Sequence, residues 1–412
     1  MASIAASNVS TSAFGCKLPT IGYEHCENPA HAHALIREAR EQGPIAMGPH
    51  GPEVLTYDLV RTVLRDNRFA MPQGLTLAAQ GITSGELWDI VVKGLLSLNG
   101  EDHQRQRRLV SKAFTPKAAS RLRTECADTI AGLVLAHRET GECDVVTDIA
   151  WRYPVHIICA LLGIPRGDWQ LLSEWGDVVF KLFDWDVVND GPDIVRAWRA
   201  LENYLGGVVD QRRAALTDDL LSDLIRAEID GDRLNHDELI NLTAGLLMAG
   251  TDTTRNQLAA AVQVFCEHPE QWALLTDHPD LVPRAVEEVM RYCPVIFAAV
   301  RKAAIDVEFG GLAIPAHTLV LANIAAANRD ASVMANADEF DITRENPRAI
   351  LTFGGGIHHC LGAHLARIEL TEALTVMARL MPSITQIGPA PWKSLTGITG
   401  PTSLPIAFGT KS

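Results

Sequence analysis

Apolar residues recur along most of this chain at the three- and four-residue spacing that is typical of helices. One such stripe comprises Leu59, Val63 and Leu64. Another begins at Leu281 and ends before Pro294, a residue that helix interiors exclude. The pattern predicts a mainly α-helical protein with few strands.

The clearest predicted helix begins near Asn235, which can act as the N-cap of a capping box completed by Glu238. Its apolar pattern continues to about Phe265, before Pro269. A helix of about 30 residues is about 45 Å long. Because most of its faces are apolar, we expect it to run through the centre of the protein.

Short strands are predicted near the start of the chain and in its last third. Residues 44–56 form a predicted hairpin, and further strand signals lie at 307–309, 319–321 and 404–408. Strands and helices do not alternate, and the chain has no GxGxxG motif. Both observations argue against a doubly wound dinucleotide-binding fold.

The composition is that of a globular protein, with 47% hydrophobic and 21% charged residues in 412. Residues 1–15 are interpreted as a flexible tail and 16–412 as a single domain. A net charge of −14 argues against general binding of nucleic acid or of anionic membranes. With no secretory signal and no apolar run of about 18 residues, we expect a cytoplasmic protein without a membrane anchor.

Eight cysteines are scattered without a CxxC pair, which disfavours a disulfide framework or a zinc finger. Cys360 differs from the rest because it follows the glycines 354–356 and precedes a helical pattern that begins at Leu361. A helix N-terminus favours a thiolate, which can bind a metal or act as a nucleophile. The alternatives are a structural cysteine and a zinc site with His358 and His359, whose contiguous ligands would form a poor cage.

The segment 353–362 resembles the haem-binding loop of the cytochrome P450 superfamily, whose pattern is Phe-Gly-x-Gly-x-(Arg or His)-x-Cys-x-Gly. The matching residues are Phe353, Gly354, Gly356, His358, Cys360 and Gly362. The resemblance implies the cytochrome P450 fold, many helices with small β-sheets around a buried haem b. It also implies that Cys360 is the axial thiolate of the iron.

A second segment, 249–254, lies in the middle of the long predicted helix. The hydroxyl of Thr253 can donate a hydrogen bond to the carbonyl of Ala249. Asp252 is an acid in an apolar helix, so we expect it to have either a polar partner or a functional role. Taken alone, the pair could be a capped surface aspartate beside a packing threonine. The resemblance implies that Asp252 and Thr253 deliver protons to bound dioxygen. Gly245, Ala249 and Thr253 share one helix face, which we expect to face the oxygen-binding side.

Glu288 and Arg291 match the family's ExxR pattern, although i,i+3 pairs of this kind are common on helix surfaces. The resemblance implies a structural role for them behind the haem loop, and Arg344 is the candidate third member.

The resemblance also implies cations for the haem propionates, and the matching residues are His103, Arg107, Arg301 and His358. Each alone could equally be a solvated surface cation.

The implied substrate pocket includes the loop 75–98. Its other members are mostly apolar and comprise Gly245, Met248, Val295, Ile296, Phe297, Ala298, Ile398 and Thr399. They suggest a terpenoid, steroid, fatty acid or aromatic hydrocarbon as substrate.

The resemblance implies a haem-thiolate monooxygenase that hydroxylates or epoxidises an apolar small molecule with O2. We expect a monomer that receives two electrons from a ferredoxin and its reductase. The alternatives are a peroxide-driven haem-thiolate oxidase and a non-enzymatic haem sensor or carrier.

Residues 103–123 contain seven Lys or Arg and no Asp or Glu, with Arg105, Arg108 and Lys112 on one helix face. This run predicts a docking patch for an acidic ferredoxin, or a solvated cationic helix.

Overall fold

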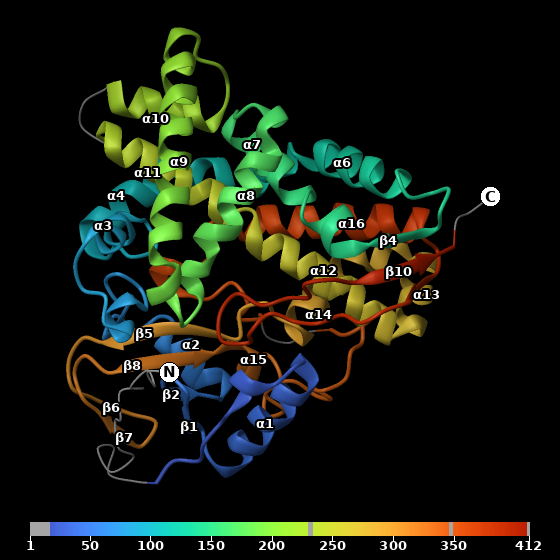
Figure 1. Ribbon diagram of the computed structural model, residues 1–412. Coiled ribbons are helices and arrows are strands. Elements are labelled where there is room, and N and C mark those ends of the chain that lie inside the picture. Colours follow the sequence, from blue (N-terminus) through green and yellow to red (C-terminus); the bar gives the residue numbers. More distant parts are fainter. Residues whose placement is uncertain (1–16, 230–233, 346–348, 410–412) are drawn as a thin grey trace.

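The computed structural model describes residues 17–229, 234–345 and 349–409 (Figure 1). The predicted tail, residues 1–15, lies outside these ranges. A body of packed helices fills most of the view in Figure 1, and the largest sheet lies along one side with helix α1 (Pro29–Gln42). The prediction of a mainly helical protein with small sheets is therefore confirmed.

From α7 to α14 the helices of the body follow one another with short connections, whereas longer segments precede α7, α15 and α16. The longer ones are α3 (Glu86–Lys93), α4 (Gly100–Ser111), α6 (Arg123–Leu135), α7 (Tyr153–Leu162), α8 (Trp169–Val179), α9 (Val187–Ala214), α10 (Leu220–Ile229), α11 (His236–Ala249), α12 (Asp252–Glu267), α13 (Pro269–Asp277), α14 (Val282–Tyr292) and α16 (Ala363–Leu380). The shorter ones are α2 (Tyr57–Val63), α5 (Pro116–Ser120) and α15 (Ile324–Ala327). Helix α12 contacts α7, α13, α14 and α16, and its residues Leu258, Val262 and Phe265 are fully buried.

The strands form three small sheets. The first has five strands in the order β1-β2-β8-β5-β3, the second has the order β4-β10-β9, and the third pairs β6 with β7. Their bounds are β1 (Ile45–Gly48), β2 (Gly51–Val54), β3 (Phe69–Ala70), β4 (Glu142–Asp144), β5 (Ala298–Ala303), β6 (Val307–Phe309), β7 (Leu312–Ile314), β8 (Leu319–Asn323), β9 (Ile384–Gln386) and β10 (Pro405–Phe408). The predicted hairpin is confirmed, because β1 and β2 pair antiparallel with Gly48 opposite Gly51.

The long helix predicted from Asn235 is present as two helices. The capping box at its start is confirmed, with 2.9 Å bonds in both directions between Asn235 and Glu238. The expectation of one unbroken helix was wrong, because α11 ends at Ala249, and Gly250 and Thr251 separate it from the start of α12 at Asp252. A Cβ on Gly250 would lie 2.8 Å from Ile158 of α7, so α7 approaches too closely for any larger residue there. Such a glycine weakens a helix.

One segment, 145–162, is apolar and long enough to pass a test of length and composition for a membrane-spanning helix. It comprises a π-helical turn at Val145–Ala150 and helix α7. However, 56% of it is buried inside the protein, and the core helix of a water-soluble protein passes the same test.

Candidate active site

The loop that carries Cys360 is shaped by its glycines. Gly354 and Gly356 have φ angles of +69° and +67°, a region that favours glycine. A Cβ on Gly356 would lie 2.6 Å from the carbonyl oxygen of Leu64, so the loop lies tightly against the end of α2. The backbone N–H of Cys360 donates to the carbonyl of Phe353 at 2.9 Å, which closes the loop.

The Cys360 side chain is exposed and lies two residues before Gly362, the N-cap of α16. Although the residue is accessible to solvent, crowding of the thiol by neighbouring protein atoms raises its pKa. A hydrogen bond from the Gly362 backbone and the charges of Arg107 and Arg367 act in the opposite direction. An exposed thiol with three groups that stabilise its thiolate is suited to bind a metal ion.

Four side chains that carry or can carry positive charge lie together beside this loop. His103 and Arg107 come from α4, Arg301 from β5, and His358 from the loop itself. The imidazole rings of His103 and His358 are 4.4 Å apart. Arg107 donates a hydrogen bond to the carbonyl of His359, which joins α4 to the loop. The structure therefore brings all four predicted propionate-binding residues to one place.

No carboxylate of the described residues forms an ion pair with this cluster. Burial, followed by the charges of His103, Arg301 and Arg107, lowers the pKa of His358 to about 3. Arg301 is buried, and within the described ranges its guanidinium donates to the carbonyl of Val300 at 2.8 Å and pairs with no carboxylate. The Nδ1 atom of His103 is also buried without a partner. Because a buried unpaired cation is costly, the cluster fits a ligand that carries carboxylates.

One face of α11 and α12 is open, although these helices are otherwise buried. Ala249 is exposed, and Gly245 and Thr253 are half-buried, whereas most of their neighbours on both helices are buried. The Oγ1 of Thr253 donates to the carbonyl of Ala249 at 3.3 Å, which is the predicted back-bond. A Cβ on Gly245 would meet nothing within 4 Å. This face therefore leaves room for a flat ligand and a small molecule.

Asp252 begins α12 and is buried. Its Oδ1 accepts a 2.6 Å hydrogen bond from the Nε of Arg255, and the Nζ of Lys393 lies 3.5 Å away. The buried acid therefore has the partner that its sequence position required.

The predicted substrate residues divide into two groups. Ile296 and Ile398 are half-buried and form an isolated β-bridge, so they lie side by side. Phe297 differs from the expectation, because its ring packs against Tyr23 and His33 in a separate core. The reason is the alternation of an extended chain, which directs successive side chains to opposite faces.

Val295 and Met248 also differ from the expectation. Both are buried in the main hydrophobic core, and a Cβ added to Gly176 of α8 would lie 3.6 Å from the Sδ of Met248, so this side chain packs against α8. The apolar wall of the predicted pocket is therefore narrower than the sequence suggested.

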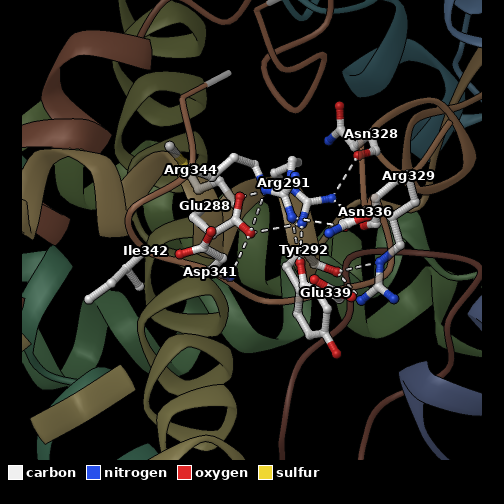
Figure 2. A network of polar contacts seen from close by, with 12 residues as sticks. Glu288, Arg291, Tyr292, Asn328, Arg329, Asn336, Glu339, Asp341, Ile342 and Arg344 are labelled. Carbon is white, nitrogen blue, oxygen red and sulfur yellow. Dashed lines mark hydrogen bonds and ion pairs between the residues drawn. The ribbon is translucent and has the colours of Figure 1, made fainter. Parts of the chain in front are cut away.

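The ExxR pair forms a buried network with Arg344 (Figure 2). Arg291 donates two hydrogen bonds to the Glu288 carboxylate, at 2.7 and 2.8 Å. The same carboxylate accepts from Arg344 at 3.1 Å and from the backbone of Asp341 at 3.0 Å. Glu288 therefore joins α14 to the segment that precedes the cysteine loop.

Asn328 extends this network toward Cys360. Its carbonyl accepts from Arg291 at 3.1 Å (Figure 2). Its side chain accepts from the backbone of Leu351 and donates to the hydroxyl of Thr352, both at 2.8 Å. The network thus holds the two residues that lead directly into the cysteine loop.

The cationic run 103–123 is partly neutralised. Arg105 forms a 2.5 Å ion pair with Glu238 of α11, and Arg123 pairs with Glu372. Arg108 and Lys112 are exposed and form no ion pair within the residues that the structure covers. The predicted docking face therefore keeps these two cations, and Arg105 is engaged elsewhere.

Two partners of Asp252 were absent from the sequence predictions. Arg255 lies three residues after Asp252, and this spacing was a usable signal. Lys393 is 141 residues away, and no local pattern points to it.

The family model described as Cytochrome P450 matches residues 170–278 and 275–380. Luteothin monooxygenase of Streptomyces thioluteus is 35% identical over 378 residues, which cover 91% of this chain and 92% of that protein. Mycinamicin IV hydroxylase/epoxidase of Micromonospora griseorubida is 37% identical over 385 residues, with coverage of 90% and 94%.

Solved structures agree with these relatives. CalO2 superposes with a TM-score of 0.87 at 30% identity, covering 92% of this chain and 96% of that one. P450BioI, solved in complex with an acyl carrier protein ligated to hexadec-9Z-enoic acid, superposes with a TM-score of 0.85 at 28% identity, covering 92% and 99%.

Proposed function

Since this chain belongs to the cytochrome P450 family and is a haem-dependent monooxygenase, we propose that it hydroxylates or epoxidises a bulky apolar organic molecule. The observation that carries the proposal is the Cys360 thiol beside two arginines, Arg107 and Arg301, and two histidines, His103 and His358, which form no ion pair with a carboxylate within the described residues. The reaction inserts one atom of O2 into the substrate and reduces the other to water, with two electrons and two protons.

The residues around the loop fit haem b. We propose that the Cys360 thiolate ligates the iron and that His103, Arg107, Arg301 and His358 bind the two propionates. When bound, the haem supplies the iron chemistry by which O2 is reduced and an oxygen atom is inserted. The protein supplies the thiolate, whose electron donation favours O–O cleavage.

Thr253 and Asp252 are proposed to hold and move the protons. The 3.3 Å bond from Thr253 to Ala249 is longer than the usual 2.7–2.8 Å of a hydroxyl bond, so the hydroxyl is free to turn toward the open helix face. Asp252 adjoins Thr253 and can replace the proton that leaves. A peroxide-driven oxidase or a passive haem carrier would need no such pair.

The substrate is proposed to be apolar because the half-buried Ile296 and Ile398 adjoin each other and Gly245 and Ala249 leave space. The names of the relatives support a large natural product, since they include the epoxidation or hydroxylation of mycinamicin IV, cyclomarin C and vitamin D3.

The electron donor is proposed to be an acidic ferredoxin in the cytoplasm. Arg108 and Lys112 are exposed on the helical segment that contacts the cysteine loop through Arg107. Ile357, three residues before Cys360 in the same loop, is 52% exposed. An exposed apolar residue and unpaired cations suit a partner of opposite charge.

The test is the ratio of product to NADH consumed, with a ferredoxin and reductase as donors. We expect Thr253→Ala to keep consuming NADH while more of it ends as hydrogen peroxide and less as product. Thr375→Ala is the matched control, because Thr375 also bonds back to the carbonyl four residues earlier but is exposed on α16. If both variants form as much product per NADH consumed as the wild type, the proposed role of Thr253 is wrong.

A further inference from the structure

Phe353, the first residue of the cysteine loop, contacts both Cys360 and an arginine of α16. Its carbonyl accepts the 2.9 Å hydrogen bond from the backbone N–H of Cys360. The central carbon of the Arg367 guanidinium lies 4.4 Å from the centroid of the Phe353 ring. A cation within about 6 Å of an aromatic centroid is attracted to the face of the ring. Arg367 therefore adjoins the residue whose carbonyl closes the loop.

The Arg367 side chain folds back toward the start of α16. The residue lies on the second turn of this helix, and its Nη1 donates to the carbonyl of Ala363, the first residue of the helix, at 3.3 Å. Long side chains on a helix point toward its N-terminus, so this bond supports a direction that the helix already favours. Because Cys360 lies just before that N-terminus, the positive charge is held toward the cysteine loop.

A carboxylate of α14 holds the same guanidinium from a second helix. The Oε1 of Glu287 accepts from the Nε of Arg367, and its Oε2 accepts from Nη2 at 3.2 Å. Two bonds between a planar guanidinium and a carboxylate fix the orientation of both groups. The two side chains are 33% and 32% exposed, so the pair is partly shielded from solvent. Glu287 therefore both orients the Arg367 charge and partly neutralises it.

Two arginines act on the Cys360 sulfur, and they differ in their partners. Crowding raises the pKa of this thiol, whereas a hydrogen bond from Gly362 and the charges of Arg107 and Arg367 lower it. Arg107 donates to a backbone carbonyl and has no ion pair among the residues that the structure describes. Arg367 has Glu287 as its counter-ion. The charge of Arg367 can therefore be altered through Glu287, which lies outside the residues proposed to bind the haem.

We propose that Arg367, oriented and partly neutralised by Glu287, sets the reduction potential of the haem iron by holding a positive charge over Phe353 beside the cysteine loop. The inference rests on the proposed function, in which Cys360 ligates the iron. Reduction transfers one electron from the ferredoxin to the iron, so the iron and its thiolate ligand become more negative by one charge. A fixed cation nearby favours this reduced form, and a fixed anion opposes it. Both residues act through the ligand and are positioning residues.

The experiment measures the reduction potential of the haem-loaded protein by spectroelectrochemical titration. We expect Arg367→Gln to lower the potential and Glu287→Gln to raise it. Each should change the ratio of reduced to oxidised iron by roughly three- to tenfold, which is about 28 to 59 mV for one electron. Arg367→Lys should stay close to the wild type because it keeps the charge. Arg379→Gln is the matched control, since it removes the same charge from the last turn of α16, about 18 Å further along the helix.

A double variant separates an effect of charge from an effect of packing. Arg367→Gln combined with Glu287→Gln removes a cation and an anion together, so an electrostatic effect predicts a potential close to that of the wild type. A packing role for Arg367 predicts a shift at least as large as that of Arg367→Gln alone. Glu287→Gln by itself keeps the guanidinium against Phe353, so it tests the inference even if Arg367→Gln binds haem poorly.

The inference is overturned if Arg367→Gln and Glu287→Gln shift the potential in the same direction, if the double variant does not return toward the wild type, or if Arg379→Gln shifts it equally. The spectrum of the reduced carbon monoxide complex distinguishes this failure from failure of the proposed function. If the long-wavelength Soret band is present in the wild type and in all variants while the potential stays constant, only the inference fails. If the wild type lacks that band, the proposed function itself fails.

Discussion

Glu53 is a buried carboxyl group whose replacement by glutamine should stabilise the protein at alkaline pH. It lies in β2 and accepts hydrogen bonds from the hydroxyl of Tyr23 at 3.2 Å and from the amide of Asn323 at 2.8 Å. Burial raises its pKa from 4.5 to about 7, although the bonds from Asn323 and Tyr23 act in the opposite direction. Glutamine keeps an oxygen for these donors but cannot ionise.

The size and sign of the effect follow from this pKa. A rise from 4.5 to about 7 corresponds to about 3 kcal/mol, because one pKa unit is about 1.4 kcal/mol. The folded-state pKa lies above the unfolded value, so the stabilisation is complete below about pH 4.5 and is lost as the pH rises through about 7. At about 2.1 cal/mol/K per residue over 412 residues, about 3 kcal/mol corresponds to about 3–4 °C.

The assay is thermal unfolding followed by circular dichroism between pH 4 and 8.5. The wild type should lose about 3–4 °C relative to Glu53→Gln across this range, with the difference growing mainly between about pH 4.5 and 7. Glu308→Gln is the control, since Glu308 is exposed on β6. The reasoning is refuted if Glu53→Gln and the wild type show the same dependence on pH.

Two further predictions concern the haem and its electron donor. Cys360→Ser should lose the long-wavelength Soret band of the reduced carbon monoxide complex, and an unchanged band would exclude Cys360 as the iron ligand. Ferredoxin-driven reduction should slow as salt rises, because attraction between exposed charges is screened over about 8 Å at physiological ionic strength. Reversing Arg108 and Lys112 to Glu should raise the apparent Michaelis constant for ferredoxin and leave substrate binding nearly unchanged. Stopped-flow rates that respond to neither salt nor reversal would place the docking site elsewhere. Arg105 is left out of this test because its ion pair with Glu238 joins α4 to α11.

Features that depend on neighbouring residues could be predicted from the sequence. The strand 307–309 was predicted with the bounds observed, and the capping box at Asn235 has the predicted bonds. The haem-loop pattern was identified from ten consecutive residues, and two of its glycines have positive φ angles, which glycine adopts readily. In each case the signal and the structure that it determines lie within a few residues.

Features that depend on contacts between residues far apart in the chain could not be predicted from the sequence. The break lies at Gly250, where Ile158 of another helix leaves little room for a side chain. Phe297 points away from the predicted pocket because α1 supplies a separate core for it. The contact between Lys393 and Asp252 joins residues 141 positions apart. The local sequence around Gly250, Phe297 or Asp252 does not indicate any of these partners.

The Arg291 guanidinium uses all five of its N–H groups, two on Glu288 and three on the carbonyls of Asn328, Ala337 and Glu339. Lysine offers three donors from one point and could not replace it.

Three of these five bonds, and three more from Arg344, end on carbonyl oxygens, which every amino acid supplies. The two arginines therefore recognise the segment 335–339 by the path of its backbone. Substitutions at the exposed positions Ala335 and Glu339 should be tolerated wherever that path survives, whereas Ala337 is buried and Asp338 pairs with Arg37. Asn336 is also restricted, because its φ angle of +49° suits asparagine or glycine. A chain can thus vary in sequence around a fixed arginine while the loop that it supports keeps its shape.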